Sequence, residues 1–309
     1  MKSYSNFIDI NDSSWLENSI NLLKKDGVVV IRGISNINNI KIINNKAKKI
    51  LAVPALLGSN GYNQKDLYKK TYDGFLIGKE VVEIVTNENI LDIIEKYLND
   101  SVNLTEIFLK KDLGHNKIYF PYHMHKGTEL NINTKIPFGC GTMLYLHDTD
   151  IGAFCYALGS HNIYYNDANE ENDGLLSSSN NRLEIENNLY RIHGKKGDII
   201  IFDERGYHGP EQPVKATRTV LLYGYQSVKA SKNSTRTEIP IIINHLKGLS
   251  IRQLNTIGFN SSSRGNYEDY HLRSFSKRNT YKYMTLSLQI ITYIYLKIKN
   301  LKYTIKNII

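Results

Sequence analysis

The chain contains little cysteine, with only Cys140 and Cys155 among its 309 residues. Their spacing matches neither a metal site nor a redox pair, so we expect two buried thiols in a reducing compartment. A chain of this length can bury a sufficient core without disulfides. The sequence also lacks an uninterrupted apolar stretch of about 18 residues, and its N-terminal segment has no apolar signal-peptide core. These absences argue against a secreted disulfide scaffold and a membrane-spanning helix, and they predict a cytoplasmic protein.

Acidic residues are missing from the last part of the chain. From Arg273 to Ile309 there are eight basic residues and no acidic one, whereas the net charge of the whole chain is +9. The body of the protein is therefore nearly neutral, which argues against a nucleic-acid-binding surface. Segment 281–309 combines apolar and basic residues and predicts a helix. Two interpretations stay open: packing on the domain with a solvated basic end, or peripheral contact with an anionic membrane.

Helical periodicity is found mainly in the N-terminal part of the chain. Apolar residues recur at three- and four-residue spacing in segments 14–25, 38–52 and 89–98, which predicts three amphipathic helices. A serine and a glutamate at the start of the first helix have the spacing of a capping box. Between the first two helices, the β-branched run 28–31 predicts a buried strand.

From about residue 102, short strand-like runs follow one another without helices between them. This pattern is typical of an antiparallel sandwich or barrel. The polar segment 166–189 predicts a long exposed insertion. The predicted strands cover residues 102–110, 117–125, 141–147, 152–158, 190–193, 198–203 and 217–226.

Three histidines and one arginine stand at positions that suit metal chemistry. His123 and His125 lie at the end of a predicted strand, where residues i and i+2 point to the same side. His208 follows another predicted strand, and Arg218 lies on the next one. An H-x-ligand pair and a distant histidine form the pattern of a facial triad, which suits non-haem Fe(II). An arginine on the following strand suits a dicarboxylate, because its planar fork binds a carboxylate at two points.

Three sequence blocks, at residues 26–33, 143–162 and 194–226, resemble the phytanoyl-CoA dioxygenase family of Fe(II)/2-oxoglutarate-dependent oxygenases. They read DGVVVIRG, MLYLHDTDIGAFCYALGSHN and GKKGDIIIFDERGYHGPEQPVKATRTVLLYGYQ. The resemblance implies a mainly β fold with flanking helices and a double-stranded β-helix core, a cupin-like jelly roll. It places the catalytic domain in residues 1–230 and leaves 231–309 as a C-terminal extension. It also implies Fe(II) as cofactor, 2-oxoglutarate as co-substrate bound by Arg218, and hydroxylation of a small organic substrate.

One position departs from the family pattern, which has an acid two residues after the first histidine. Here that position is His125, and three interpretations stay open. His123, His125 and His208 form a three-histidine metal site. Alternatively, His125 is the first ligand and Gly127 occupies the acid position, where relatives admit a halide, with Glu129 as another source of the acid. The third interpretation is a decayed site, in which the fold persists as a catalytically impaired binding or accessory protein.

The remaining polar residues are interpreted as structural. Asp148 is expected to hold a turn, although it also stands as an alternate site residue near the mouth of the cavity. His161 is expected to stabilise a turn near the site entrance. If Arg218 binds the co-substrate, its replacement by alanine should weaken 2-oxoglutarate binding far more than protein stability. If His125 occupies the acid position, His125→Asp should raise turnover of 2-oxoglutarate.

Overall fold

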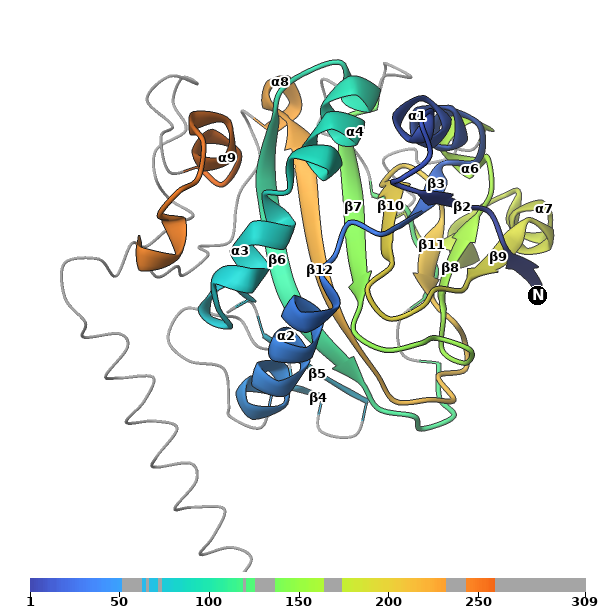
Figure 1. Cartoon of the computed structure of the whole chain (residues 1–309). Coiled ribbons are helices and arrows are strands. Elements are labelled where there is room, and N and C mark those ends of the chain that lie inside the picture. The colour runs from blue at the N-terminus through green and yellow to red at the C-terminus, as the bar shows by residue number, and fades with distance from the viewer. Residues whose placement is uncertain are drawn as a thin grey trace, which may run out of the picture.

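The described residues form two β-sheets (Figure 1). The larger sheet has eight strands in the order β2-β3-β10-β7-β12-β6-β5-β4, and the smaller has four in the order β1-β9-β8-β11. The strands are β1 (Lys2–Tyr4), β2 (Phe7–Asp9), β3 (Val28–Arg32), β4 (Asn63–Gln64), β5 (Tyr68–Thr71), β6 (Val102–Asp112), β7 (Gly139–Tyr145), β8 (Phe154–Ala157), β9 (Leu189–Ile192), β10 (Ile199–Asp203), β11 (His208–Pro210) and β12 (Arg218–Ser227). This computed structural model describes residues 1–51, 63–64, 67–71, 74–118, 121–125, 137–163, 174–231 and 243–258.

Helices cover one face of the larger sheet, where α2, α3 and α4 cross the strands (Figure 1). The helices are α1 (Trp15–Asp26), α2 (Ile37–Ile50), α3 (Lys79–Val85), α4 (Glu88–Leu98), α6 (Ser160–Ile163), α7 (Arg182–Asn187), α8 (Val228–Ser231) and α9 (Ile251–Thr256). Short 3-10 turns are η1 (Gly74–Leu76), η3 (Leu176–Ser178) and η4 (Ile243–Leu246).

The central strands are buried on both faces, which explains their continuous apolar runs. On β10, Ile199 and Ile201 pack against the helices. Ile200 and Phe202 point to the other face of the sheet and pack against residues of the smaller sheet, such as Phe154. On β7, Leu144 faces the helices and Met143 faces the other way. Successive side chains of a strand point to opposite faces, so a strand covered on both sides must be apolar at every position.

Most predicted elements are confirmed. The helices at 14–25, 38–52 and 89–98 are α1, α2 and α4, and the strand at 28–31 is β3. Cys140 and Cys155 are free and buried, as predicted. The predicted strands at 102–110, 141–147, 152–158, 190–193, 198–203 and 217–226 correspond to β6, β7, β8, β9, β10 and β12.

Two local predictions are wrong. No continuous strand covers 117–125; within its described part, His123 makes only isolated bridges to Leu175 and His208. Pro121 lies in this segment, and a proline cannot donate to a strand ladder. At the start of α1, the capping box does not form, because the Ser14 hydroxyl makes no cap hydrogen bond and instead accepts one from Asn18 Nδ2 at 2.9 Å.

The described half of the predicted exposed insertion at 166–189 is mostly exposed, but it has regular structure and packs on the domain at a few positions. Residues 174–188 contain η3 and α7, and Leu176 and Ile185 are buried. Their apolar side chains pack into the core cluster around Met124. The segment therefore supports the chain around His123, which lies next to it.

The C-terminal predictions fall mostly outside the described residues. Segment 281–309 and its predicted helix are not among them. Of the preceding part, α9 packs on the domain: Arg252 Nη1 lies 2.6 Å from Glu88 Oε2, and Gln253 Nε2 donates to the Thr86 carbonyl at 2.7 Å. In the part of the chain that is described, no helix combines the length and apolar character needed to cross a membrane.

Candidate metal centre and its cavity

The segment that carries His123 and His125 is held by backbone hydrogen bonds. His123 and His208 exchange two of them, with N–O distances of 3.0 and 2.8 Å. The Met124 amide donates to the Gly174 carbonyl at 3.0 Å, and the His125 amide donates to the Glu204 carbonyl at 2.8 Å. The segment is thus fixed on both sides without being a regular strand.

A buried ion pair holds the turn that precedes His208. The Arg205 side chain is 2% exposed, and its Nη2 lies 2.7 Å from Asp203 Oδ2. Asp203 also accepts hydrogen bonds from the Arg205 amide at 2.8 Å and from the Tyr97 hydroxyl at 2.6 Å. Since a buried charge is costly unless it is paired and hydrogen-bonded, this network defines one conformation for the turn.

Close packing imposes a glycine in the same turn. A Cβ atom on Gly206 would lie 2.0 Å from the hydroxyl oxygen of Tyr156. The Tyr156 hydroxyl donates to the Asp203 carbonyl at 2.9 Å, so its position is defined. Any side chain at position 206 would therefore displace the turn that presents His208.

The structure brings the three predicted histidines together. The ring centroids of His123 and His208 are 4.5 Å apart, those of His125 and His208 are 5.1 Å apart, and those of His123 and His125 are 5.3 Å apart. One potential ligand nitrogen from each ring lies within 4.8 Å of the other two. Small side-chain movements would let all three bind one ion.

Backbone carbonyls orient two of the rings. His123 Nδ1 lies 3.2 Å from the Pro121 carbonyl oxygen, and His208 Nδ1 lies 2.8 Å from the Gly206 carbonyl oxygen. A carbonyl only accepts, so each Nδ1 carries the proton and each lone pair is on Nε2. A carbonyl that accepts a hydrogen bond from the other ring nitrogen is the usual way to fix a metal-binding imidazole. The donor set therefore fits a divalent transition metal.

The third ring, His125, has a carboxylate behind it. Its Nδ1 lies 3.5 Å from Glu204 Oε2, and the Glu204 side chain is only 4% exposed. Two glycines make room for this carboxylate: a Cβ on Gly139 would lie 2.8 Å from Glu204 Oε2, and one on Gly224 would lie 3.3 Å from Glu204 Oε1. Position 125 thus lacks the acid of the family pattern, but the carboxylate of Glu204 lies directly behind the histidine that replaces it.

The protonation of the three rings differs because their surroundings differ. Burial and the neighbouring His125 lower the pKa of His123 to about 4. Burial, followed by the charges of His123 and His125, lowers the pKa of His208 well below its usual value. For His125, burial opposes the charged form, but the carboxylate of Glu204 outweighs it and the pKa is raised. Near neutral pH, His123 and His208 are therefore neutral, as metal binding requires.

This difference predicts how the stability of the metal-free protein depends on pH. The pKa of His123 is about 4 in the fold and near 6.5 in the unfolded chain. The unfolded chain takes up the proton first, so the free energy of unfolding should fall as the pH decreases from about 6.5 to 4. We expect wild type to lose about 2 kcal/mol more than His123→Gln between roughly pH 7 and 4.5. Urea unfolding with a chelator present measures this, and equal losses in both proteins would contradict it.

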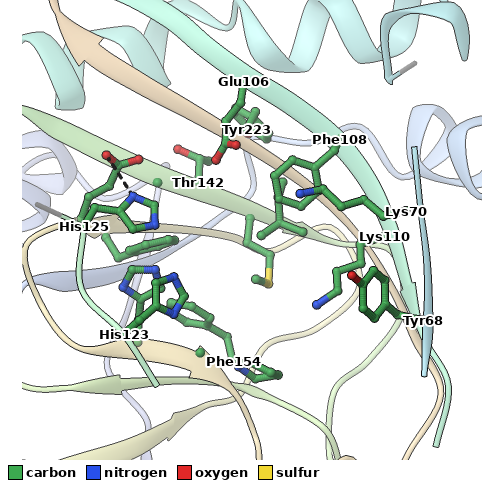
Figure 2. A pocket seen from close by; sticks show the side chains of 18 of the residues that line it. Tyr68, Lys70, Glu106, Phe108, Lys110, His123, His125, Thr142, Phe154 and Tyr223 are labelled. Atoms are coloured by element: carbon green, nitrogen blue, oxygen red, sulfur yellow. Dashed lines mark ion pairs between the residues drawn. The ribbon is translucent and has the colours of Figure 1, made fainter. Parts of the chain in front are cut away.

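A cavity of about 270 Å³ opens beside the three histidines. His123 and His125 lie on one side of it, and Lys70 and Lys110 lie on the other (Figure 2). Between them the lining is largely apolar and aromatic. It includes Phe108, Met143, Phe154, Phe202 and Leu222.

Arg218 lines the same cavity and is 3% exposed. Its Nε lies 2.7 Å from Asp112 Oδ2, and its Nη1 donates to the Gly152 carbonyl at 2.8 Å. Lys110 Nζ lies 3.1 Å from the other oxygen of Asp112, and burial lowers the pKa of Lys110 to about 8. The arginine and the lysine thus share one carboxylate, and this end of the cavity has a positive excess.

The other predicted residues lie elsewhere. Asp148 is exposed, accepts a hydrogen bond from the Lys196 amide at 2.7 Å and does not line the cavity. His161 is buried, with Nε2 3.2 Å from the Lys24 carbonyl at the end of α1, which is a structural role. Gly127 and Glu129 are outside the described residues.

Sequence reasoning missed Glu106, Glu204, Lys70 and Lys110. A signal was present on β6, where Glu106, Lys110 and Asp112 point to the same face of the strand, together with Phe108. The alternate positions, such as Ile107 and Leu109, belong to the core beneath the helices. A charged face on a strand that is otherwise buried indicates a polar cavity. For Glu204, no pattern in the sequence marked its contact with His125.

Comparison with known proteins places the fold. No family model and no curated protein matches the chain. Among solved structures, the epimerase SnoN in complex with Fe3+, alpha ketoglutarate and nogalamycin RO matches with a TM-score of 0.55 and 14% identity, over 70% of this chain and 85% of SnoN. EctD from S. alaskensis with bound Fe matches with a TM-score of 0.54 and 16% identity, over 74% of this chain and 81% of EctD.

A third structure agrees with these two. HygX from Streptomyces hygroscopicus with nickel and 2-oxoglutarate bound matches with a TM-score of 0.50 and 15% identity, over 72% of this chain and 90% of HygX. The core is a double-stranded β-helix. This confirms the predicted mainly β fold with flanking helices, and identities at this level show the fold alone.

Proposed function

We propose that the protein is a non-haem Fe(II)/2-oxoglutarate-dependent oxygenase that oxidises a small organic molecule. The observation that carries the proposal is the convergence of His123, His125 and His208 beside a cavity that Arg218 also lines. The structural neighbours SnoN, EctD and HygX support it, because their structures hold iron or nickel, and two of them hold the keto acid. The sequence blocks described above resemble the phytanoyl-CoA dioxygenase family and support a function of that type.

The metal ligands in this proposal are the three histidines, with His123 and His208 binding through Nε2. With Fe(II) bound, the oxidant would be O2, which takes two electrons from 2-oxoglutarate as the keto acid is decarboxylated to succinate and the other two from the substrate C–H bond. The chain positions the reactants and keeps water out. Phe154, Met143 and Leu222 supply the apolar lining that serves this purpose.

The co-substrate carboxylate would bind at the positive end of the cavity. Arg218 and Lys110 both line it, and Asp112 holds each of them in place. Lys110 Nζ points into the cavity from β6 (Figure 2). A preorganised cation binds a carboxylate with little loss of side-chain entropy, which favours this site over a mobile surface lysine.

Among the interpretations of position 125, the described geometry favours the three-histidine site. Glu204 places a negative charge 3.5 Å behind His125, and a carboxylate behind a histidine raises its basicity as a ligand. The family supplies a negative charge from an acid bound directly to the metal. Here Glu204 supplies part of that charge through its contact with His125. Glu204 acts here as a positioning residue for His125.

This arrangement changes the expectation for His125→Asp. The single substitution removes the partner of Glu204. It also leaves three acids at one end of the cavity: the new aspartate at position 125, Glu204 and Glu106. We therefore expect His125→Asp alone to give no gain in 2-oxoglutarate turnover. In His125→Asp with Glu204→Gln, one acid can bind the metal directly, and no unpaired carboxylate remains behind it. We expect the double variant to exceed the single one by about tenfold, or about 1.4 kcal/mol in activation free energy.

The measurement is succinate formed per bound iron, with wild type and the three variants loaded equally. Glu204→Gln alone serves as the control, because it removes the negative charge behind His125 and leaves the three histidines unchanged. A single variant as fast as the double one would show that Glu204 does not influence position 125.

One experiment decides the proposed function. Protein purified anaerobically is loaded with Fe(II), its metal content is measured, and succinate formation from 2-oxoglutarate is followed. We expect about one iron per chain and a slow release of succinate without added substrate. A protein that neither retains iron nor forms succinate would instead be a dioxygenase-fold binding or accessory protein.

The role of the C-terminal extension is a separate proposal. We propose that 231–309 is a C-terminal extension of the catalytic domain of residues 1–230, and that 281–309 contacts an anionic membrane surface from the cytoplasmic side. The described part of the extension packs on the domain. The basic residues of this segment support it. Sedimentation with phosphatidylserine vesicles, with and without 281–309, tests the contact.

A further inference from the structure

Glu106 on β6 differs from the other charged residues that line the cavity. Lys110 and Arg218 lie 3.1 and 2.7 Å from Asp112, and Glu204 lies 3.5 Å from His125. Lys70 Nζ lies 3.6 Å from the centroid of the Phe108 ring. Among the described residues, no hydrogen bond or ion pair reaches the Glu106 carboxylate.

Glu106 also lies close to a second acid. A Cβ on Gly224 would lie 3.3 Å from both Glu106 Cγ and Glu204 Oε1, so the two acids approach each other over one glycine. Burial, followed by the negative charge of Glu204, raises the pKa of Glu106. His125 and Lys70 also face it and oppose this effect without reaching ion-pair distance. A lining carboxylate that is not paired within the protein points to a partner in the ligand.

Neighbouring groups extend this polar end of the cavity. Thr142 and Tyr223 also line it, and each is 1% exposed. In the described part of the chain, neither hydroxyl has a hydrogen-bond partner. Figure 2 shows Glu106, Thr142 and Tyr223 at one end of the cavity and Lys110 with Tyr68 at the other. The two ends therefore differ in sign, with an excess of acid at one and of base at the other.

We propose that the substrate carries a protonated amine that pairs with Glu106. The proposal rests on the function proposed above, and it names the substrate class of the same site. The keto acid, a dianion, would take the basic end near Arg218 and Lys110. The substrate would then enter with its cationic group at the acidic end, on the side of His125. Glu106 would set specificity, since an amine held there lies close to one of the proposed metal ligands.

The test uses primary amines paired with alcohols of the same carbon skeleton: butylamine with butan-1-ol, hexylamine with hexan-1-ol, and benzylamine with benzyl alcohol. Affinities are measured by calorimetry on the metal-free protein, which excludes coordination of the amine to iron. They are then measured on the protein loaded with Fe(II) and 2-oxoglutarate without oxygen. At least one amine should bind about tenfold more tightly than its alcohol, and Glu106→Gln should remove that preference.

Two controls separate binding from other roles of Glu106. Glu106→Gln should keep the Fe(II) affinity of wild type and should not lower the melting temperature. Glu211→Gln is the matched substitution: that carboxylate accepts hydrogen bonds from Arg191 Nε at 2.6 Å and from the Gly152 amide at 2.8 Å, so its loss should lower the melting temperature.

The proposal is overturned if no amine binds more tightly than its alcohol, or if the preference survives in Glu106→Gln. It is also overturned if Glu106→Gln loses Fe(II) affinity, which would make Glu106 a metal ligand, or melts several degrees below wild type, which would make it structural. Failure of the proposed function is a different result: iron and succinate are then absent, while the amine preference of the metal-free protein can still be measured.

Discussion

His208→Ala is expected to weaken the binding of Fe(II), or of Co(II) as a spectroscopic substitute, by more than about 100-fold. Loss of an outer-shell partner already costs about 10- to 100-fold in metal affinity, and His208 would be a direct ligand. Its Nδ1 is bonded to the Gly206 carbonyl, and its backbone is paired with His123, so the ring is preorganised. Calorimetric titration of the metal-free protein measures the change.

The matched control is His193→Ala. His193 Nδ1 lies 2.7 Å from the Thr149 carbonyl, and the residue does not line the cavity. This variant should bind the metal as wild type does. His123→Ala provides a second test of the site should His208→Ala fold poorly. If metal affinity is unchanged in both His123→Ala and His208→Ala, these histidines do not bind the metal, and the proposed metal centre is wrong.

Arg218→Ala is expected to lower the free energy of unfolding by about 3–5 kcal/mol. Costs of this size are typical when one partner of a buried ion pair is removed. Lys110 Nζ stays 3.1 Å from Asp112 and compensates only part of the lost charge. The side chains of Arg218 and Asp112 are 3% and 0% exposed, and the guanidinium also bonds to the Gly152 carbonyl. This changes the expectation from sequence, which gave Arg218 a role in co-substrate binding with little effect on stability. Urea denaturation measures the change.

Two further variants separate stability from binding. Arg182→Ala removes an arginine paired with Glu186 where both side chains are exposed, and it should cost less than about 1 kcal/mol. Arg218→Gln with Asp112→Asn removes both charges of this pair. It should recover part of the stability, because Lys110 then lacks its carboxylate partner. If Arg218 holds 2-oxoglutarate, the double variant should be more stable than Arg218→Ala and still bind the keto acid at least about tenfold more weakly than wild type. An Arg218→Ala protein as stable as wild type would contradict the structural role of the pair.

Regular elements could be predicted because their patterns are local. Strands such as β3 and β10 are covered on both faces, so their sequences are continuously apolar and easy to recognise. The segment around His123 could not be predicted in the same way. Its backbone bonds come from Gly174, Glu204 and His208, which are distant in the sequence. The two histidines converge with His208 although the predicted strand beneath them is absent.

The sequence by itself determined the fold class and the positions of three histidines and one arginine, because residue type and spacing carry that information. Only the tertiary structure decided which charges meet. Asp112 takes up Arg218 and Lys110, Glu204 lies behind His125, and Glu106 faces the cavity without an ion-pair partner among the described residues. Pairing between side chains depends on distances of a few ångströms between strands that are far apart in the chain. Such distances are set when the sheets pack, and no local pattern encodes them.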